Sequence, residues 1–274
     1  MRTQAEKAAI FRALHERPGA FIIPNPWEAS TAKILAALGF EALATTSLGL
    51  ANMLGRADSR VSRAEVIDNA RVIVEATDLP VNVDLENGFA HAPEAAAEAI
   101  WLAAEAGAAG GSIEDATGDP KEPIYEFDLA VARVRAAADV ARLLPVPFML
   151  TARAENFLHG RSDMGDTIRR LQAFEAAGAD VLYAPGIRTL AEVREICAAV
   201  KRPFNVVTGW LERDITASQL AEAGAKRISV GGALNRLALA SFTNAARAMK
   251  EQGSFAWMRD MAAIGELRGM FAVG

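Results

Sequence analysis

Residues 81–115 read VNVDLENGFAHAPEAAAEAIWLAAEAGAAGGSIED and contain one complete repeat of the fold. A short β-branched run at 81–85 is followed by an alanine-rich stretch at 92–106, whose apolar residues recur with helical spacing. Gly107 comes directly after that stretch, where a glycine commonly ends a helix. A second short run begins at residue 110. This order predicts a strand, a helix and a further strand of a parallel sheet.

The same alternation extends along the whole chain. Eight short runs recur about every 29 residues, close to the roughly 30 residues of a strand–helix unit. They lie at 21–25, 42–47, 81–85, 110–115, 148–154, 181–185, 204–208 and 227–232. We therefore predict an α/β fold, a (β/α)8 TIM barrel, with residues 1–274 forming a single domain. A Rossmann fold is disfavoured because no GxGxxG follows the first run.

Further helices are predicted between and around these runs. Amphipathic stretches rich in Ala, Leu, Glu and Arg occupy 128–143, 166–177 and 233–250. Gly178 follows the second of them and is predicted to end that helix, as Gly107 ends the one before the fourth run. A helix at 3–16 precedes the first strand and could close the bottom of the barrel. An additional C-terminal helical segment is expected at 254–270, with an apolar face that could fold back on the barrel or pack against another subunit.

Composition excludes several classes of protein. The net charge is −5, and the 29 basic residues are scattered among 34 acidic ones, so we expect no nucleic-acid partner. Charged or polar residues interrupt every apolar stretch before it reaches about 18 residues, so we expect no membrane span. The one cysteine, Cys197, excludes an internal disulfide and favours a reducing compartment. With no apolar signal core near Met1, we expect a cytoplasmic protein.

Acidic residues gather where the strands of the predicted barrel end, which is where barrel enzymes build their sites. Asp84 and Glu86, separated by Leu85, come at the end of the third run, where strand alternation predicts that both side chains project to one side. Glu114 and Asp115 end the fourth run, and Asp58 lies in the loop after the second. Four converging carboxylates repel one another unless a cation lies among them, and oxygen ligands suit Mg²⁺ or Mn²⁺. The alternative is that each acid caps a helix or stays solvated.

Arg153 lies within the apolar fifth run, where a cation needs an anionic partner. That partner could be a nearby acid in a structural ion pair, or a substrate carboxylate or enolate oxygen. The small residues at 45–49 could bring backbone N–H groups near an anion, and Gly231 and Gly232 could do the same or simply form a turn. Residues 115–127 are polar and rich in turn formers, which suits a lid or an ordinary surface loop.

Together these segments resemble the isocitrate lyase/phosphoenolpyruvate mutase superfamily, whose members are (β/α)8 barrels that act on 2-oxo acids with Mg²⁺. The similarity runs from PNPW at 24–27 to Arg236. DLENGFA at 84–90 is similar to the superfamily's DxDTGYG metal motif. The other matching segments are LGRADSR at 54–60, SIEDATGDP at 112–120, TARAEN at 151–156 and GGALNR at 231–236.

The resemblance implies a role for each matching residue. Asp84 would bind Mg²⁺ directly, and Asp58, Glu86 and Glu114 would hold its water shell. The substrate-binding residues would be Thr46, Ser47, Leu48, Asp84, Arg153 and Arg236, with the backbone of the first three holding a carboxylate. The catalytic residues would be Arg153, Asp58 and Glu114.

Two departures from the superfamily pattern bear on the reaction. Glu86 stands where the motif has an aspartate, one methylene shorter. The loop after the fourth run reads Lys121-Glu122-Pro123 and lacks the catalytic cysteine of the lyase branch, and it has no clear counterpart of the mutase asparagine. Cys197 is expected in a helix at 192–200, far from the site, as a small packed residue. Cysteine-dependent cleavage and phosphonate formation are therefore disfavoured.

The resemblance implies a Mg²⁺-dependent carbon–carbon lyase or decarboxylase. Its substrate would be a small 2-oxo dicarboxylic acid such as oxaloacetate, or its adduct, cleaved through a metal-stabilised enolate. The first alternative is a carbon–phosphorus bond enzyme, a phosphonopyruvate hydrolase or mutase. The second is a barrel that binds 2-oxo acids with little turnover. The superfamily also implies a homodimer or homotetramer, and the apolar segment after residue 253 fits a subunit contact.

Overall fold

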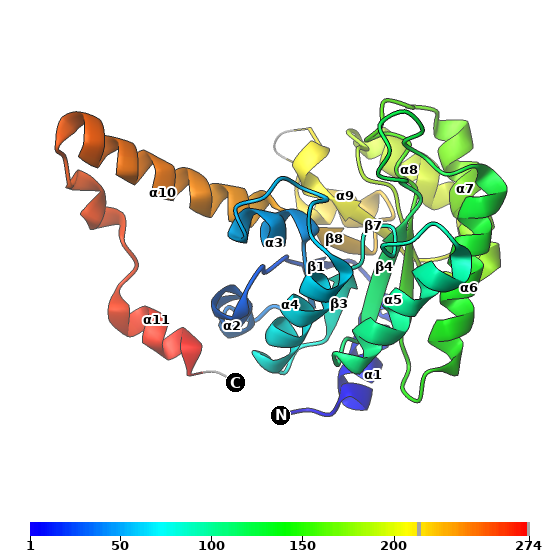
Figure 1. Ribbon diagram of the computed structural model, residues 1–274, viewed down its shortest axis with the longest axis horizontal. Coiled ribbons are helices and arrows are strands. Elements are labelled where there is room, and N and C mark those ends of the chain that lie inside the picture. The colour runs from blue at the N-terminus through cyan, green and yellow to red at the C-terminus, as the bar shows by residue number, and fades with distance from the viewer. Residues whose placement is uncertain (213–214, 273–274) are drawn as a thin grey trace.

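Eight parallel strands form a nearly closed barrel in the computed structural model, which describes residues 1–212 and 215–272 (Figure 1). The strands are β1 (Phe21–Ile23), β2 (Leu43–Ala44), β3 (Val81–Asp84), β4 (Gly110–Glu114), β5 (Met149–Arg153), β6 (Val181–Tyr183), β7 (Phe204–Val207) and β8 (Arg227–Ser229). Their order is β1-β8-β7-β6-β5-β4-β3-β2, with β1 in parallel register with β8. Ala44 N donates to Pro24 O at 3.1 Å, which joins the two ends of the sheet. The predicted (β/α)8 barrel is confirmed.

Helices follow the strands and surround the barrel (Figure 1). They are α1 (Gln4–Glu16), α2 (Ala29–Ala37), α3 (Ser47–Met53), α4 (Arg63–Glu75), α5 (Pro93–Glu105), α6 (Phe127–Leu143), α7 (Met164–Ala177), α8 (Leu190–Ala199), α9 (Ala217–Glu222), α10 (Ala233–Gln252) and α11 (Ile264–Phe271). Two short 3₁₀ turns, Thr208–Trp210 and Ala256–Asp260, complete the described helices. Within this part of the chain, no helix is long and apolar enough to cross a membrane.

Local residue choice explains where the helices begin and end. Thr3, Ser62 and Thr189 start their helices with a side-chain hydrogen bond to the backbone three residues on. Gly107 and Gly178 follow α5 and α7 with φ of 90° and 112°, the left-handed conformation that glycine adopts without strain. At these two glycines the helices end, and the chain enters β4 and β6 within three residues. The glycine helix ends predicted from the sequence are therefore present.

The helix α1 closes the amino end of the barrel. Phe11 of α1 is fully buried in an apolar cluster that includes Phe21 of β1 and Met149 of β5. That cluster fills the end of the barrel from which the strands start, so a ligand enters from the other end. The suggested position of the first helix agrees with this arrangement.

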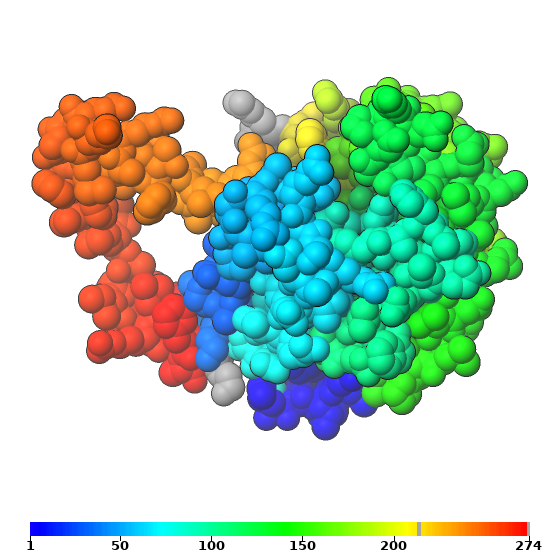
Figure 2. Space-filling view, in the orientation of Figure 1, coloured from blue at the N-terminus to red at the C-terminus, as the bar shows by residue number. Residues whose placement is uncertain are grey.

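The C-terminal segment forms an arm beside the barrel. Helix α10 runs outward from the end of β8, and α11 returns toward α2, where Lys33 Nζ donates to Phe271 O at 3.1 Å (Figure 1). Between them the segment predicted as one helix at 254–270 is in two pieces, the 3₁₀ turn Ala256–Asp260 and α11. The space-filling view shows an opening between this arm and the barrel (Figure 2).

Candidate active site

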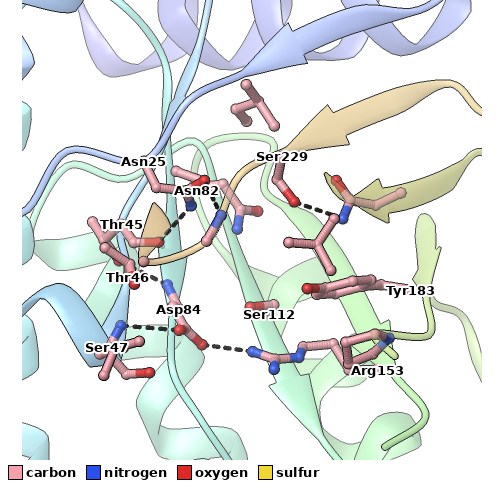
Figure 3. A pocket seen from close by; sticks show the side chains of 18 of the residues that line it. Asn25, Thr45, Thr46, Ser47, Asn82, Asp84, Ser112, Arg153, Tyr183 and Ser229 are labelled. Atoms are coloured by element: carbon pink, nitrogen blue, oxygen red, sulfur yellow. Dashed lines mark hydrogen bonds and ion pairs between the residues drawn. The ribbon is translucent and has the colours of Figure 1, made fainter. Parts of the chain in front are cut away.

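A cavity of about 190 Å³ with many polar side chains in its wall lies inside the barrel and extends to the carboxyl ends of the strands. Residues from all eight strands, and from several of the loops after them, line its wall. The predicted site residues Thr46, Ser47, Leu48, Asp58 and Arg153 are among them, as is Asp84. The fold therefore brings these residues from four separate regions of the chain to one place (Figure 3).

Arg153, the last residue of β5, lies at the centre of the acidic groups. Its Nη1 is 2.9 Å from Asp84 Oδ1, its Nη2 is 3.1 Å from Glu114 Oε2, and its Nε is 2.8 Å from Glu155 Oε1. The ring of Tyr183 lies 5.0 Å from the guanidinium carbon. The side chains of Arg153, Asp84 and Glu114 are only 14–16% exposed, so these ion pairs are weakly screened. The guanidinium is thereby fixed by three carboxylates at the cavity wall.

Asp84 links Arg153 to the loop after β2. Its Oδ2 accepts a hydrogen bond from the backbone N–H of Ser47 at 3.1 Å, while its other oxygen pairs with Arg153 (Figure 3). The backbone N–H of Asp84 donates to Thr45 Oγ1 at 2.9 Å, which fixes the end of β3 against that loop. The Ser47 N–H, the Asp84 carboxylate and the Arg153 guanidinium thus form a continuous chain of contacts along the cavity wall. This arrangement suits a ligand with neighbouring carboxylate and carbonyl oxygens.

Glu86 lies beyond the end of β3, in a left-handed conformation with φ of 46°. Strand alternation therefore ends at Asp84 and does not govern where the Glu86 side chain points. Burial, and then the charges of Asp84 and Asp58, raise the pKa of Glu86 to about 8. Its Oε1 is buried without a hydrogen-bond partner among the described residues. This carboxyl therefore lacks the partner that an ionised buried group needs.

The pKa values of Asp58 and Glu114 are also raised, which favours the protonated form of each. Burial, followed by the charge of Asp84, raises the pKa of Asp58. Burial raises the pKa of Glu114 well above its usual range despite the opposing charge of Arg153. The single guanidinium of Arg153 therefore does not balance the carboxylates around it, and the site favours an additional cation.

The donor set fits a hydrated divalent cation. Among the described residues, no three acidic, histidine or cysteine side chains lie close enough together to enclose a metal ion directly. Mg²⁺ commonly keeps several water ligands and contacts only one or two carboxylates, so it does not need such an enclosure. The unpartnered Glu86 oxygen and the crowding of Asp58, Asp84 and Glu86 fit this mode of binding.

Some predicted residues lie apart from the cavity. Arg236 is exposed on the first turns of α10 and does not line the cavity wall. Its neighbour Asn235 is buried and accepts from Asn52 Nδ2 at 2.8 Å, so a helix places Arg236 about 100° away, toward solvent. Cys197 in α8 lies against Gly224, where a Cβ built on that glycine would come within 2.7 Å of the Cys197 Cβ. Cys197 is thus packed away from the site, as expected.

The loop at 115–127 is anchored at both ends. Tyr125 N donates to Asp115 O at 2.8 Å, and Ala116 pairs with Ile124 as an antiparallel bridge. Asp115 is held by Arg170, whose Nη1 lies 3.2 Å from Asp115 Oδ2. The exposed tip of this loop lies between these anchors.

A second set of polar residues lies inside the barrel and was not predicted from the sequence. Residues two positions before the strand ends also face inward, and they are Asn82, Ser112, Thr151, Asn205 and Arg227. Ser229, the last residue of β8, joins them by accepting a hydrogen bond from Asn205 Nδ2. The signal was present as an alternation of polar residues, Asn82 with Asp84 and Thr151 with Arg153, in otherwise apolar strands. These residues lie before the carboxyl ends of the strands, where the site was predicted.

Fold and site together define a (β/α)8-barrel enzyme whose cavity carries acidic groups around one arginine at the strand ends. The family model described as phosphoenolpyruvate phosphomutase matches residues 11–250. The chain belongs to this family, within the phosphoenolpyruvate mutase/isocitrate lyase superfamily. The resemblance noted in the sequence is confirmed.

Relatives support the same placement. A protein from Burkholderia cenocepacia J2315, provisionally described as a lyase or mutase, has a crystal structure with 53% identity and a TM-score of 0.96, covering 98% of this chain and 97% of that one. Oxaloacetate decarboxylase of Bradyrhizobium diazoefficiens is 29% identical over 84% of this chain and 79% of its own length. 2-Methylisocitrate lyase of Escherichia coli is 31% identical over 71% and 67%. The chain is an enzyme whose homologues are lyases of this superfamily.

Proposed function

We propose that this enzyme is a Mg²⁺-dependent lyase that breaks a carbon–carbon bond in a small 2-oxo dicarboxylic acid or its adduct. The observation that carries the proposal is the continuous arrangement of the Ser47 N–H, the Asp84 carboxylate and the Arg153 guanidinium on one cavity wall. Such a wall provides hydrogen-bond donors for a substrate carboxylate and a charged group for an adjacent carbonyl oxygen. Decarboxylation of oxaloacetate is the simplest reaction of this kind.

The residues of the chain have distinct parts in the proposed mechanism. The backbone of Thr46, Ser47 and Leu48 binds the substrate carboxylate, and the Arg153 fork orients the 2-oxo group. Bond cleavage leaves an electron pair that is delocalised onto the 2-oxo oxygen as an enolate, and the Arg153 charge stabilises that oxygen. Asp84 would hold Mg²⁺, with Asp58, Glu86 and Glu114 on its water shell. When bound, the ion supplies further positive charge to the developing enolate.

The enolate must finally be protonated. Tyr183 lines the cavity beside Arg153, and burial raises the pKa of its phenol, which therefore keeps its proton at neutral pH. No cysteine lies in the loop at 115–127. We propose the Tyr183 hydroxyl as the group that holds this proton, in place of the cysteine of the lyase branch.

A substrate panel with and without chelator tests the reaction. The panel contains oxaloacetate, 2-methylisocitrate, 2,3-dimethylmalate and phosphonopyruvate, with release of pyruvate, carbon dioxide and phosphate measured separately. The proposal expects carbon–carbon cleavage that needs Mg²⁺. Phosphate release would instead favour the carbon–phosphorus alternative, and binding without product would favour the 2-oxo acid-binding barrel.

Asp84→Ala tests the metal assignment. The variant should lose measurable Mg²⁺ binding in isothermal titration calorimetry, because it removes the direct ligand while Asp58 and Glu86 bind only through water. Asp68→Ala is a matched control, since Asp68 is an exposed acid on α4. Unchanged Mg²⁺ affinity in Asp84→Ala would overturn the assignment of Asp84.

We also propose that the enzyme is a homodimer or homotetramer of the cytoplasm. Exposed apolar side chains on the arm formed by α10 and α11 support assembly, because a surface of this kind commonly contacts a partner. Cys197 as the only cysteine suits a reducing compartment.

A further inference from the structure

Arg227 is a buried cation in the interior of the barrel. It is the first residue of β8 and is only 3% exposed. Its Nε donates to Asn205 Oδ1 at 2.7 Å, and its Nη2 donates to Thr151 Oγ1 at 3.1 Å. Its Nη1 is buried without a hydrogen-bond partner among the described residues. The guanidinium is therefore held in place by neutral groups and left only partly satisfied.

No carboxylate of the described chain lies within ion-pair distance of Arg227. Its ionisable neighbours are His15 and Tyr183. Burial, and then the charge of Arg227, lower the pKa of His15 to about 3, while burial raises the pKa of Tyr183. Burial lowers the pKa of Arg227 to about 9, which still leaves it charged at neutral pH. A buried charge without a counterion is unfavourable, so this position favours an anion.

The same cavity joins Arg227 to the proposed catalytic groups. Arg227 stands in register with the first residue of β1, at the amino end of the barrel, whereas Asp84 and Arg153 end their strands. All three line one cavity, and Asn82, Ser112 and Ser229 add polar groups to its wall (Figure 3). The cavity is therefore acidic near its mouth and cationic at depth. A ligand that suits both parts carries a metal-binding head and a second anionic group.

We propose that Arg227, with Asn205 and Thr151 fixing its guanidinium, forms a subsite for the distal carboxylate of the substrate. The inference rests on the proposed function, because it takes the 2-oxo acid head to lie at Ser47, Asp84 and Arg153. The cavity of about 190 Å³ is smaller than the roughly 300 Å³ at which drug-sized pockets begin, so the ligand is a short diacid. Arg227 thus determines specificity for a charged tail over an apolar one.

The subsite also bears on which bond breaks. A carboxylate held by Arg227 would lose its ion pair on becoming neutral carbon dioxide, so this contact would favour the ground state over the transition state of decarboxylation. The subsite therefore favours cleavage in which the distal carboxylate stays on a product. Within the proposed function, the Arg227 subsite favours cleavage of an aldol-type adduct over decarboxylation of oxaloacetate.

Pairs of ligands that differ only at the tail test the subsite. The four-carbon pair is 3,3-difluorooxaloacetate and 3,3-difluoro-2-oxobutyrate, which share the same C3 group, and the five-carbon pair is 2-oxoglutarate and 2-oxopentanoate. Oxalate serves as a ligand for the head alone. Binding to the full-length protein with Mg²⁺ is measured by isothermal titration calorimetry. Arg227→Met removes the charge at similar length, and Arg135→Met, on the exposed face of α6, is the matched control.

The wild type and the Arg135→Met control should bind at least one diacid roughly 10-fold to 100-fold more tightly than its methyl-ended partner, the range for hydrogen bonds to a charged group. Arg227→Met should lose that preference and keep its oxalate affinity within about twofold. A wild type that binds both members of each pair equally would overturn the proposal, and this comparison needs no variant to fold. Equal losses for oxalate and diacid in a folded Arg227→Met protein would overturn it as well, since they indicate a structural role.

Failure of the proposed function gives a different result. If oxalate does not bind with Mg²⁺ but the diacid preference persists and depends on Arg227, the head site is wrong and the anion subsite stands. A water molecule bonded to the unpaired Nη1 is the competing occupant, and it satisfies a hydrogen bond without neutralising the charge. Water alone predicts no diacid preference, so the wild-type comparison also decides between these occupants.

Discussion

Arg153 uses all three of its nitrogen positions on carboxylates, and this geometry cannot be reproduced by a single charge. Its Nη1, Nη2 and Nε contact Asp84, Glu114 and Glu155 at 2.8–3.1 Å. A structural ion pair and a substrate-orienting fork both need such partners, so the contacts alone do not separate the two interpretations. The functional interpretation is favoured by the position of Arg153, which lines the cavity.

Arg153→Lys separates them. Lysine keeps the charge but lacks the planar fork, so we expect kcat/KM to fall roughly 100-fold or more, mainly through kcat. Arg17→Lys is the control, because Arg17 makes a two-pronged contact with Glu41 on the exposed surface. Steady-state kinetics and far-ultraviolet circular dichroism are measured for both variants. Equal rates in wild type and a folded Arg153→Lys protein would return Arg153 to the structural interpretation.

His15 contributes to stability with a defined pH dependence. Its Nδ1–H donates to Phe11 O at 2.8 Å, and burial followed by the Arg227 charge lowers its pKa from 6.5 to about 3. Between these values the unfolded chain binds a proton that the folded chain does not. His15 therefore destabilises the fold as the pH falls from about 6.5 toward 3, by about 1.4 kcal/mol per pH unit.

His15→Asn tests this sign. Asparagine can keep the bond to Phe11 O but does not titrate, so its free energy of unfolding should fall less steeply than that of the wild type over the same range. Urea unfolding at several pH values gives both slopes, and His159→Asn controls for an exposed histidine. Parallel slopes for wild type and His15→Asn would contradict the prediction.

At the scale of elements, the turn between β3 and α5 positions Glu86. Gly88 in this turn has φ of 74°, and a Cβ there would come within 2.8 Å of Ala96 O in α5. Arg133 of α6 holds the same turn by donating to the carbonyl oxygens of Asn87, Ala90 and His91. The turn is thus packed on both sides and has little freedom to adjust.

Gly88→Ala should therefore cost more than backbone strain alone. We expect the free energy of unfolding to fall by roughly 2 kcal/mol or more, from left-handed strain plus the clash with α5. Gly118→Ala is the control, because Gly118 also has positive φ, 80°, but nothing lies within 4 Å of its added Cβ. Strain alone predicts a loss of about 1 kcal/mol there. Equal losses in urea unfolding would show that contact with α5 contributes nothing.

The elements were predictable wherever a local signal decided them. Gly107 and Gly178 marked helix ends because only glycine adopts those backbone angles without strain, and the alternation of short apolar runs predicted all eight strands. Strand lengths were overestimated, since pairing in the barrel ends β1 at Ile23. The direction of the Glu86 side chain could not be predicted from strand alternation, because Glu86 lies in the packed turn with a left-handed φ of 46°.

Site residues were predictable at the strand ends and less so at depth. Asp84 and Arg153 could be found because barrel geometry brings strand ends together whatever the helices do. Arg236 was placed by resemblance alone, and the burial of its neighbour Asn235 turns it outward on α10. Arg227 alternates with Ser229 in β8, but as the strand's first residue it lies outside the strand-end positions from which the site was predicted.

At the scale of the whole molecule, the arm leaves apolar side chains uncovered. Exposed residues on it include Leu237, Phe242, Phe255, Met261 and Ile264. Helix α10 projects from the barrel with an opening beside it (Figure 2). A solvent-exposed arm of this kind is unfavourable in water, because large apolar surfaces are rarely left uncovered. A second copy of the chain would bury it.

Phe242→Glu tests this assembly. Phe242 is 72% exposed on α10, so a charge there leaves the barrel core intact but opposes burial in a subunit contact. We expect the wild type to be a dimer or tetramer by multi-angle light scattering, and Phe242→Glu to have a lower mass at equal concentration. Leu143→Glu, at an 85% exposed position on α6, should leave the mass unchanged. A monomeric wild type would contradict the proposal, because the arm would then be stable without a partner.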